Sequence, residues 1–437
     1  MRFDEPVLLY GAGREARSTR AFIKARAPKT KVFVTVDSGE ADIEGTEIIA
    51  PVDLPAAIAE HRFATIVKSP GVSRYRPIFA VAREAGIAVT SNLNLWAEAY
   101  RTGRTVVAIS GTKGKSTTAT LVHLMLTESG LDAGLAGNVG LAPLEIADRH
   151  QIVVFELSSY QTADMAFSPD IAAITNLTPE HTDWHRDVNR YYADKLNLID
   201  RDHPMSVALG AGARDNPLVL EAVRDRKRLI PPLAPFIADR IATAVGRSRL
   251  RGTHNLDNAM LAAQIAMRAG ADLEAVVRGI EAFTPLPHRL EEHQFGGRAF
   301  VNDSISTTPE ATKAALNAYE GQRIALIAGG HERHQDYTEL AALLAPAGVT
   351  VLVCLPVTGD RLATATYAAA PEIEVLEAAD LRAAMEALAS RRESYDTIIL
   401  SPGAPSYGQR EAPGKVFRNF EERGQAFVAL AKELFEN

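Results

Sequence analysis

Short apolar runs alternate with helix-length amphipathic stretches along most of the chain. In the first ninety residues, runs of strand length lie at 7–10, 31–36, 65–68 and 87–90. Helical patterns at 16–26 and 76–85 lie between them. Strands that alternate with helices are typical of βαβ units, in which parallel strands share one sheet. The N-terminal region is therefore predicted to form an α/β domain.

Two further series of the same kind follow. The second begins at Thr105 and contains VVAIS, QIVVFELSS and IAAITNLT before long helical material that extends to Ala282. The third follows the proline-containing segment 284–289, and its apolar runs lie at 299–302, 323–328, 349–355, 373–376 and 397–400. Prolines of this kind often mark boundaries. The pattern predicts an α/β protein of three domains, at 1–96, 97–285 and 286–437.

Composition narrows the class of function. The 437 residues carry a formal charge of −7, which disfavours a general affinity for nucleic acid or an anionic membrane. No apolar run approaches the ~18 residues of a membrane helix, and the start MRFDEPVLLYGAG is unlike a secretory signal. Cys354 is the only cysteine, so a reducing compartment fits. We expect a cytoplasmic protein.

The segment VVAISGTKGKSTTATLVHLML, residues 106–126, has the order of a phosphate-binding loop: an apolar strand, a glycine turn and a helix. The turn is shorter than the GxxxxGK[ST] spacing, because Ile109 stands where the first glycine would be. Glycines permit close backbone approach, and N–H groups at the helix start attract an anion. Lys115 would neutralise the β and γ phosphates, and Ser116 or Thr117 could hold Mg²⁺. The alternative is a solvated lysine pair beside an ordinary helix.

Other positions could serve the same site. Glu156 ends the next apolar strand and could supply the hard oxygen that Mg²⁺ prefers, and His181 lies in the polar loop after a third strand. Lys195 falls on a helical pattern that equally suits a surface lysine. Asn255 and Asn258, on one helical face, could bracket an adenine or ribose, or could be a helix cap and a packing residue.

The first domain carries two weaker signals. GAGREARS after the first strand matches only part of the GxGxxG fingerprint, and Asp37 ends the second strand, where a ribose-binding acid would lie. SPGV, which contains Ser69 and Gly71, closes another strand and places backbone N–H groups at the carboxyl edge of the sheet. Both segments could be ordinary turns.

Seven motifs follow one another along the chain: GTKGKST, FELSSYQ, NLTPEHTDWH, ADK, GTHNLDNA, LPHRLE and VNDS. In that order and at these separations they resemble the Mur ligases of peptidoglycan synthesis, nearest to the MurD type, which adds glutamate to UDP-N-acetylmuramoyl-L-alanine. The resemblance spans essentially the whole chain. It implies a Rossmann-like N-terminal domain for the UDP sugar, a central P-loop ATPase domain with a parallel-rich sheet, and a Rossmann-like C-terminal domain for the amino acid.

The resemblance also implies an ATP-dependent, ADP-forming reaction of cell-wall precursor synthesis. ATP would phosphorylate the alanine carboxylate, and the amine of glutamate would attack the acyl phosphate to give an amide and phosphate. Carboxylate is a poor electrophile, so lysine and two Mg²⁺ ions would stabilise charge on the phosphoryl oxygens. The partners would be UDP-N-acetylmuramoyl-L-alanine, glutamate and ATP, with no nucleic acid or membrane, and the protein would be a monomer.

Carried over position by position, the resemblance assigns site residues. ATP would contact Gly111, Thr112, Lys113, Gly114, Lys115, Ser116, Thr117, Asn255, Asn258, Arg289 and Asp303. The UDP sugar and glutamate would contact Asp37, Ser69, Gly71, Asn138, Ser159, Gln161, His181 and Ser406. The catalytic set would be Lys115, Glu156, His181 and Lys195, and the metal set Ser116, Glu156, His181 and Lys195. Lys195 resembles the family lysine that CO₂ carbamylates, which turns it into a Mg²⁺ ligand.

The glutamate pocket departs from that of the D-glutamate enzymes. Their GTNGKST loop has asparagine where Lys113 stands, and they carry a lysine at the position of Ile305. The lysine after their glycine pair is missing from GGHERHQD, where Arg333 or His334 could replace its charge, and their SPACAS segment becomes SPGAPSYGQ, with Ser406 kept. Cations are strong handles on carboxylates, so moving them changes how glutamate is held. We therefore favour the L-glutamate-adding branch.

Three alternatives stay open at this point. The first is the same reaction with D-glutamate, because enantiomer choice depends on pocket contacts. The second is a folylpolyglutamate synthetase-like ligase, which shares the ATPase core, although SPGV and the glutamate-domain signatures argue against it. The third is a nucleotide-binding regulator without catalysis, which could have lost Lys195, Glu156 or His181; all three are present.

Overall fold

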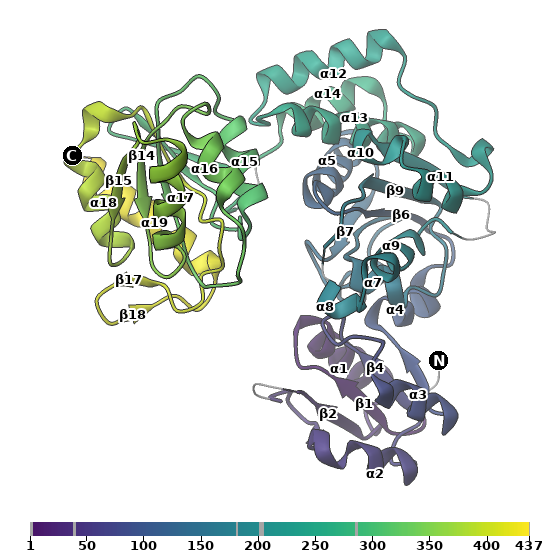
Figure 1. Ribbon diagram of the computed structural model, residues 1–437. Helices are drawn as coiled ribbons and strands as arrows, with labels where there is room; N and C mark the ends of the chain where they lie inside the picture. Colours follow the sequence, from purple (N-terminus) through teal and green to yellow (C-terminus); the bar gives the residue numbers. More distant parts are fainter. Residues whose placement is uncertain (1–2, 38–40, 181, 201–204, 285–286, 437) are drawn as a thin grey trace. The chain divides into compact units, whose positions relative to one another are not determined.

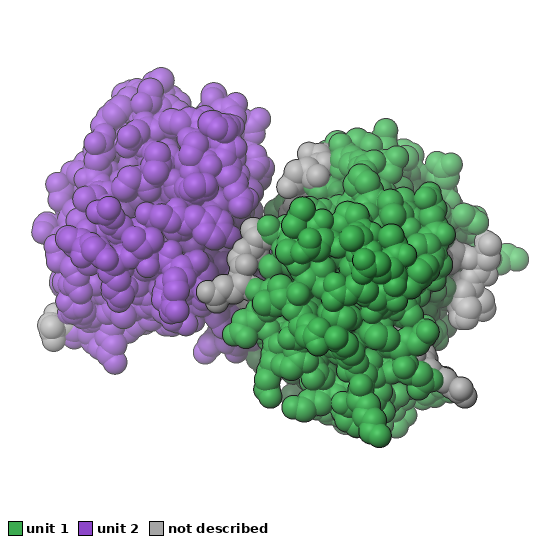
Figure 2. Space-filling model, turned by 90° about the horizontal axis from the view of Figure 1, so that it is seen from below, with its two compact units in different colours: residues 1–248, 254–283 green, residues 249–253, 284–437 purple. Residues whose placement is uncertain are grey.

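The computed structural model describes residues 3–37, 41–180, 182–200, 205–284 and 287–436 (Figure 1). The chain divides into two compact units, residues 1–248 with 254–283 and residues 249–253 with 284–437 (Figure 2). The described residues form three large sheets of five, five and six strands, two in the first unit and one in the second. The predicted α/β class with three sheets is confirmed.

The first sheet has the strand order β3-β2-β1-β4-β5, with every pair parallel. Its strands are β1 (Val7–Tyr10), β2 (Val32–Thr35), β3 (Glu47–Ile48), β4 (Thr65–Lys68) and β5 (Ala88–Thr90). Its helices are α1 (Arg14–Arg26), α2 (Leu54–Ala59), α3 (Pro77–Glu84) and α4 (Asn92–Tyr100). The order reverses at β1, and ligands of open α/β sheets bind beyond the carboxyl end of the strand at such a reversal.

The central sheet has the order β10-β9-β6-β8-β7 and is also parallel throughout. Its strands are β6 (Thr105–Ser110), β7 (Ala133–Gly137), β8 (Ile152–Glu156), β9 (Ile171–Asn176) and β10 (Ser206–Gly210). Its helices are α5 (Lys115–Glu128), α6 (Pro143–Ile146), α7 (Ser159–Asp164), α8 (Thr182–His185), α9 (Val188–Leu196), α10 (Ala211–Arg214) and α11 (Pro217–Val223). Here the order reverses at β6, so the GTKGKST turn follows the reversal strand.

Three longer helices complete the first unit: α12 (Pro235–Arg247), α13 (Thr253–Arg268) and α14 (Leu273–Glu281). Helix α14 packs directly on α5, because a Cβ at Gly279 would lie 2.9 Å from the Cα of Met125. Glycine lets the two backbones approach this closely. Helix α5, which follows the phosphate loop, is therefore fixed by its packing against α14.

The third sheet has the order β11-β12-β16-β13-β14-β15, in which only β11 is antiparallel. Its strands are β11 (Glu291–Phe295), β12 (Arg298–Asn302), β13 (Ile324–Ala328), β14 (Val349–Cys354), β15 (Glu374–Glu377) and β16 (Thr397–Leu400), and a separate hairpin pairs β17 (Arg410–Ala412) with β18 (Lys415–Val416). Its helices are α15 (Pro309–Asn317), α16 (Thr338–Leu344), α17 (Gly359–Ala369), α18 (Leu381–Ala389) and α19 (Phe420–Phe435).

One continuous apolar core joins the first and central sheets. Leu9 of β1 and Ala108 of β6 belong to the same buried cluster. Trp96 of α4 packs edge-on against Phe155 of β8, with ring centroids 4.7 Å apart. The two sheets therefore form one body, which fixes the loops after β1 and β6 relative to each other.

Among the described residues, no helix combines the length and apolarity needed to cross a membrane.

Candidate active site

The turn after β6 needs its glycines. Gly111 has φ +142°, and a Cβ there would lie 1.9 Å from Oγ1 of Thr175 at the end of β9. Gly114 has φ +82°, a left-handed conformation that glycine adopts without strain. The hydroxyl of Thr175 also donates a hydrogen bond of 2.6 Å to the carbonyl of Lys113. The neighbouring strand end thus fixes the loop that leads into the N-terminus of α5.

The two lysines of this turn have different surroundings. Lys115 is the first residue of α5 and donates a 2.7 Å hydrogen bond to the carbonyl of Thr112, so its ammonium group folds over the loop. Lys113 points to Glu180, with 2.6 Å between Nζ and Oε1, and its side chain is half exposed. Glu180 thus balances the charge of Lys113, which was predicted as an ATP contact.

Lys195 lies deep in the same site. It is 2% exposed, and its Nζ donates a 2.7 Å hydrogen bond to the carbonyl of Gly111. Burial, and then the charge of Lys115, lower the pKa of Lys195 well below its ordinary range. A lysine surrounded this way is far from the surface lysine that the helical pattern allowed, and its amine is readily neutral.

Glu156 ends β8, the strand that pairs with β6 before the phosphate loop. Its side chain is fully buried, and Oε1 accepts a 3.0 Å hydrogen bond from Nδ2 of Asn138. Oε2 is buried without a hydrogen-bond partner among the described residues. An orphaned buried carboxylate oxygen costs free energy unless a cation or donor meets it, so this acid fits a divalent metal.

The remaining predicted metal residues are only partly visible. Ser116 and Thr117 lie in the first turn of α5, as the motif predicts. His181 lies outside the described residues. Within the described ranges, no group of three or more His, Cys, Asp or Glu side chains forms a ready-made metal site.

Helix α7 carries two predicted substrate residues, and both are buried. Ser159 Oγ lies 2.9 Å from Nε2 of His185, whose Nδ1 lies 2.6 Å from Asp194. Gln161 forms a capping box with Ser158, the N-cap residue: each side chain bonds the backbone N–H of the other. The start of α7 is therefore rigid, and both side chains are fixed.

The predicted nucleotide residues Asn255 and Asn258 contact each other. Nδ2 of Asn258 donates a 3.1 Å hydrogen bond to Oδ1 of Asn255, and Asn258 is 8% exposed. A Cβ at Gly114 would lie 2.3 Å from Oδ1 of Asn258. Asn258 therefore packs against the phosphate loop.

The first-sheet residues lie at the carboxyl ends of β1, β2 and β4. Oδ1 of Asp37 accepts a 2.8 Å hydrogen bond from the Tyr10 hydroxyl and pairs with Arg76. Burial, and then the bond to Asp37, raise the pKa of Tyr10 to about 12. A Cβ at Gly11 would lie 2.5 Å from Oγ of Ser69, so the turns after β1 and β4 touch.

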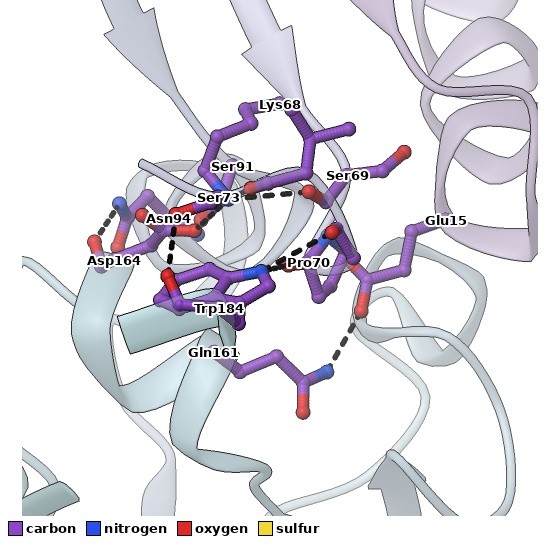
Figure 3. A network of polar contacts seen from close by, with 12 residues as sticks. Glu15, Lys68, Ser69, Pro70, Ser73, Ser91, Asn94, Gln161, Asp164 and Trp184 are labelled. Carbon is purple, nitrogen blue, oxygen red and sulfur yellow. Dashed lines mark hydrogen bonds and ion pairs between the residues drawn. The ribbon is translucent and has the colours of Figure 1, made fainter. Parts of the chain in front are cut away.

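A buried network ties these turns to the central sheet, and sequence reasoning missed most of it. Lys68, 2% exposed, pairs with Asp164 at 2.6 Å and donates hydrogen bonds to the carbonyls of Ser69 and Val72. Trp184 lies against the same turn, and its indole N–H donates to the carbonyls of Pro70 and Gly71, each at 3.1 Å (Figure 3). The sequence signal that could have revealed Lys68 is its position at the end of the apolar run TIVK.

In the second unit, the loops after β12, β13 and β16 meet at one edge of the sheet. Asp303 is buried, and its Oδ2 accepts a 2.8 Å hydrogen bond from Ser401. Burial raises the pKa of Asp303 to about 6, while the charge of Arg289 opposes that rise. Ser406 is buried in the SPGAPSYGQ loop. Asp303, Arg289 and Ser406 thus belong to the same end of this unit.

Arg423 of α19 is a buried arginine of the second unit. It is fully buried, and it donates to the carbonyls of Ser304 and Ala404 and to the side chains of Ser304 and Gln409. All these acceptors are uncharged, and burial lowers the pKa of Arg423 to about 9. The NDS and SPGAPSYGQ loops are therefore joined by a cation that sequence reasoning did not single out.

Two family models match the chain. The Mur ligase middle domain matches residues 109–226, and the Mur ligase, glutamate ligase domain matches residues 288–403. The first covers the phosphate loop, Glu156 and Lys195, and the second covers the loops around Asp303. The matches therefore include the phosphate loop and Asp303, while the first-sheet residues, Asn255, Asn258, Ser406 and Arg423 lie outside them.

Two relatives that match over nearly their full length share one name. A UDP-N-acetylmuramoyl-L-alanine–L-glutamate ligase of Micromonospora sp. is 33% identical, with 98% of this chain and 96% of that protein covered. The protein of the same name from Xanthomonas euvesicatoria pv. vesicatoria is 35% identical, with coverage of 97% and 94%. Both alignments run through all three sheets.

Solved structures share the fold. The UDP-N-acetylmuramate-alanine ligase MurC from Thermotoga maritima superposes with a TM-score of 0.60 at 16% identity, over 97% of this chain and 98% of that one. MurF from Acinetobacter baumannii gives the same TM-score at 16% identity, over 97% and 90%. With the domain matches and the full-length relatives, this places the chain in the Mur ligase family.

Proposed function

We propose that this protein joins L-glutamate to UDP-N-acetylmuramoyl-L-alanine, with ATP as the energy source, in peptidoglycan precursor synthesis. Full-length relatives at 31–35% identity named for this activity support the assignment. The phosphate loop after β6 is the observation that carries the ATP chemistry, because its lysine, glycines and helix start surround one anion-binding position. The function predicted from the sequence and this proposal agree.

The reaction needs an activated carboxylate. Transfer of the γ-phosphoryl group of ATP to the alanine carboxylate gives an acyl phosphate and ADP. The amine of glutamate attacks the acyl carbon, the new C–N bond forms as the C–O bond to phosphate breaks, and the amine releases a proton. Lys115 and the N–H groups at the start of α5 would stabilise the charge on the phosphoryl oxygens during the transfer.

The residues present fit Mg²⁺. The orphaned Oε2 of Glu156 and the hydroxyl of Ser116 would hold the metal, with His181 as the sequence predicts. Bound Mg²⁺ supplies charge neutralisation on the phosphates. Two ions remain the expectation that the family resemblance implies.

Lys195 fits the predicted carbamate. A buried neutral amine can add to CO₂ and lose a proton, which leaves an anionic carbamate in place of the amine. The N–H that remains would still donate to the carbonyl of Gly111, where Nζ donates now. The carbamate would add oxygen ligands beside Glu156, which suits a hard cation.

The remaining predicted contacts belong to the same proposal. Asp37, Ser69, Gly71, Asn138, Ser159 and Gln161 would hold the UDP sugar, and Ser406 would contact glutamate. Asn255, Asn258, Arg289 and Asp303 would contact ATP. A cytoplasmic monomer organised as domains 1–96, 97–285 and 286–437 completes the proposal.

Phosphate release tests the function. Purified protein receives ATP, Mg²⁺, UDP-N-acetylmuramoyl-L-alanine and either enantiomer of glutamate, and each component is left out in turn. The proposal predicts release only in the complete mixture, with L-glutamate at least about tenfold faster than D-glutamate. Preference for D-glutamate would indicate the conventional MurD reaction, and nucleotide binding without turnover would indicate a regulator.

A further inference from the structure

The side-chain amide of Gln161 forms three hydrogen bonds with the protein and keeps one N–H group without a partner among the described residues. Its Oε1 accepts from the backbone N–H of Ser158 at 2.9 Å and from the Ser158 hydroxyl at 3.0 Å. Its Nε2 donates to Oε1 of Glu15 at 2.7 Å. An amide nitrogen carries two N–H groups, so one donor remains for another partner.

Glu15 comes from α1, the helix that follows the first strand of the first sheet. It is the second residue of α1, directly after the glycine turn that follows β1, and it is 9% exposed. The Gln161 amide points toward its carboxyl group in Figure 3. Its second oxygen, Oε2, is buried with no hydrogen-bond partner among the described residues. Among the described residues, the carboxyl group of Glu15 therefore forms its one hydrogen bond with Gln161.

These contacts decide which way the amide faces. A flip of the Gln161 carboxamide would bring Nε2 against the N–H of Ser158 and Oε1 against the carboxylate of Glu15. Donor would then meet donor and acceptor would meet acceptor, and each buried mismatch is costly. Only the observed orientation satisfies both ends, so the group that Gln161 keeps for another partner is an N–H donor.

We propose that Glu15 is a positioning residue that holds Gln161 as a hydrogen-bond donor toward an acceptor oxygen of the UDP-sugar substrate, a phosphoryl or carbonyl oxygen. This inference rests on the proposed function for the identity of the substrate. It adds a residue of the first sheet to a binding group carried by the central sheet.

The charges around Glu15 support this role. Lys68 and Arg14 attract its carboxylate, while Asp164 repels it. Burial is the largest cause and raises the pKa of Glu15 to about 7, while the hydrogen bond from Gln161 opposes that rise. The Lys68–Asp164 pair holds the last residue of α7 as Glu15 holds its third, so the helix is fixed to the first sheet at two points.

Binding of UDP-N-acetylmuramoyl-L-alanine, measured by titration calorimetry without ATP or glutamate, tests the inference. Glu15→Leu removes the acceptor, and the dissociation constant should rise about 10-fold, the equivalent of one hydrogen bond to a charged group. Glu15→Gln keeps an acceptor oxygen and should bind at least about fivefold more tightly than Glu15→Leu. Equal binding by these two variants would overturn the proposal.

A swapped pair separates positioning from mere packing. Gln161→Glu alone places two acids in contact, so both the melting temperature and the affinity should fall. Glu15→Gln with Gln161→Glu restores one acid and one amide with the polarity reversed. The melting temperature should recover to nearly the wild-type value, while binding stays about 10-fold weaker because residue 161 no longer donates. Recovery of affinity together with stability would overturn the proposal.

Two comparisons keep the outcomes distinct. Glu60→Gln, at the exposed C-cap residue of α2, controls for the change of net charge and should bind as the wild type does. If the wild type does not bind the UDP sugar, the proposed function fails and the inference fails with it. If the wild type binds and turns over but the variants bind equally well, only the inference fails.

Discussion

The turn after β1 and the turn after β6 have the same backbone feature, a glycine with positive φ directly after the strand. Each follows the strand at which the order of its sheet reverses, and each leads into a helix. Gly11 has φ +107° and its Cβ would meet Ser69, just as Gly111 has φ +142° and its Cβ would meet Thr175. In both turns, glycine allows the chain to touch the end of the neighbouring strand.

The side chains that follow make the two turns different. The carbonyl groups of the turn after β6 accept hydrogen bonds from Lys115 and Lys195, and the adjacent strand β8 ends in Glu156, whose Oε2 is buried without a partner among the described residues. The turn after β1 carries the buried acid Glu15, which holds an amide of the other sheet. The glycines thus give both turns a similar backbone, and the charged side chains nearby make the difference. Lysines suit the turn after β6 to phosphate binding, while Glu15 after β1 positions Gln161.

The largest expected effect lies at Lys195. Lys195→Ala should lower the turnover number roughly 100- to 1,000-fold, because a ligand at the phosphate loop is lost. Short carboxylic acids in the assay should restore part of the rate by filling the vacated space. Full activity, or an inactive variant that no acid rescues, would make this lysine structural.

Removal of Lys115 is expected to be nearly as severe. Lys115→Met keeps the length of the side chain and removes its charge, so the turnover number should fall roughly 100-fold. Calorimetry should show weaker ATP binding while binding of the UDP sugar is retained. A variant that binds and hydrolyses ATP normally would remove the phosphate role from this residue.

The turn after β1 should respond to pH through Glu15. Its pKa of about 7, against an ordinary 4.5, means that the native state holds a proton that the unfolded chain releases between these values. The free energy of unfolding should therefore fall as the pH rises from about 4.5 to about 7. Glu15→Gln removes this component, on the order of 2 kcal/mol. Urea unfolding at pH 5 and 8 measures it, and a gap between variant and wild type that does not widen with pH would contradict the assignment.

The smallest effect is expected at Lys113. Its ammonium group pairs with the partly exposed Glu180, and pairs of this kind contribute little. Lys113→Asn should change the Michaelis constant for ATP by less than about threefold. A loss as large as that of Lys115→Met would show that both lysines serve the phosphates.

The strand and helix pattern predicted the three sheets and the phosphate loop because both depend on local sequence. The pattern could not separate a buried Lys195 from a surface lysine, since the burial comes from the loop after β6. Glu15 and Lys68 were missed for the same reason: their partners Gln161 and Asp164 lie about 100 or more positions away and meet them only in the fold. Arg423 became visible only through the loops it joins.

The enantiomer of glutamate in the product tests the central claim most directly. The complete reaction is run with an equal mixture of L- and D-glutamate, and the UDP-linked product is purified, hydrolysed and separated on a chiral column. The account predicts that L-glutamate makes up nearly all of the added residue. A product that contains mainly D-glutamate would contradict it.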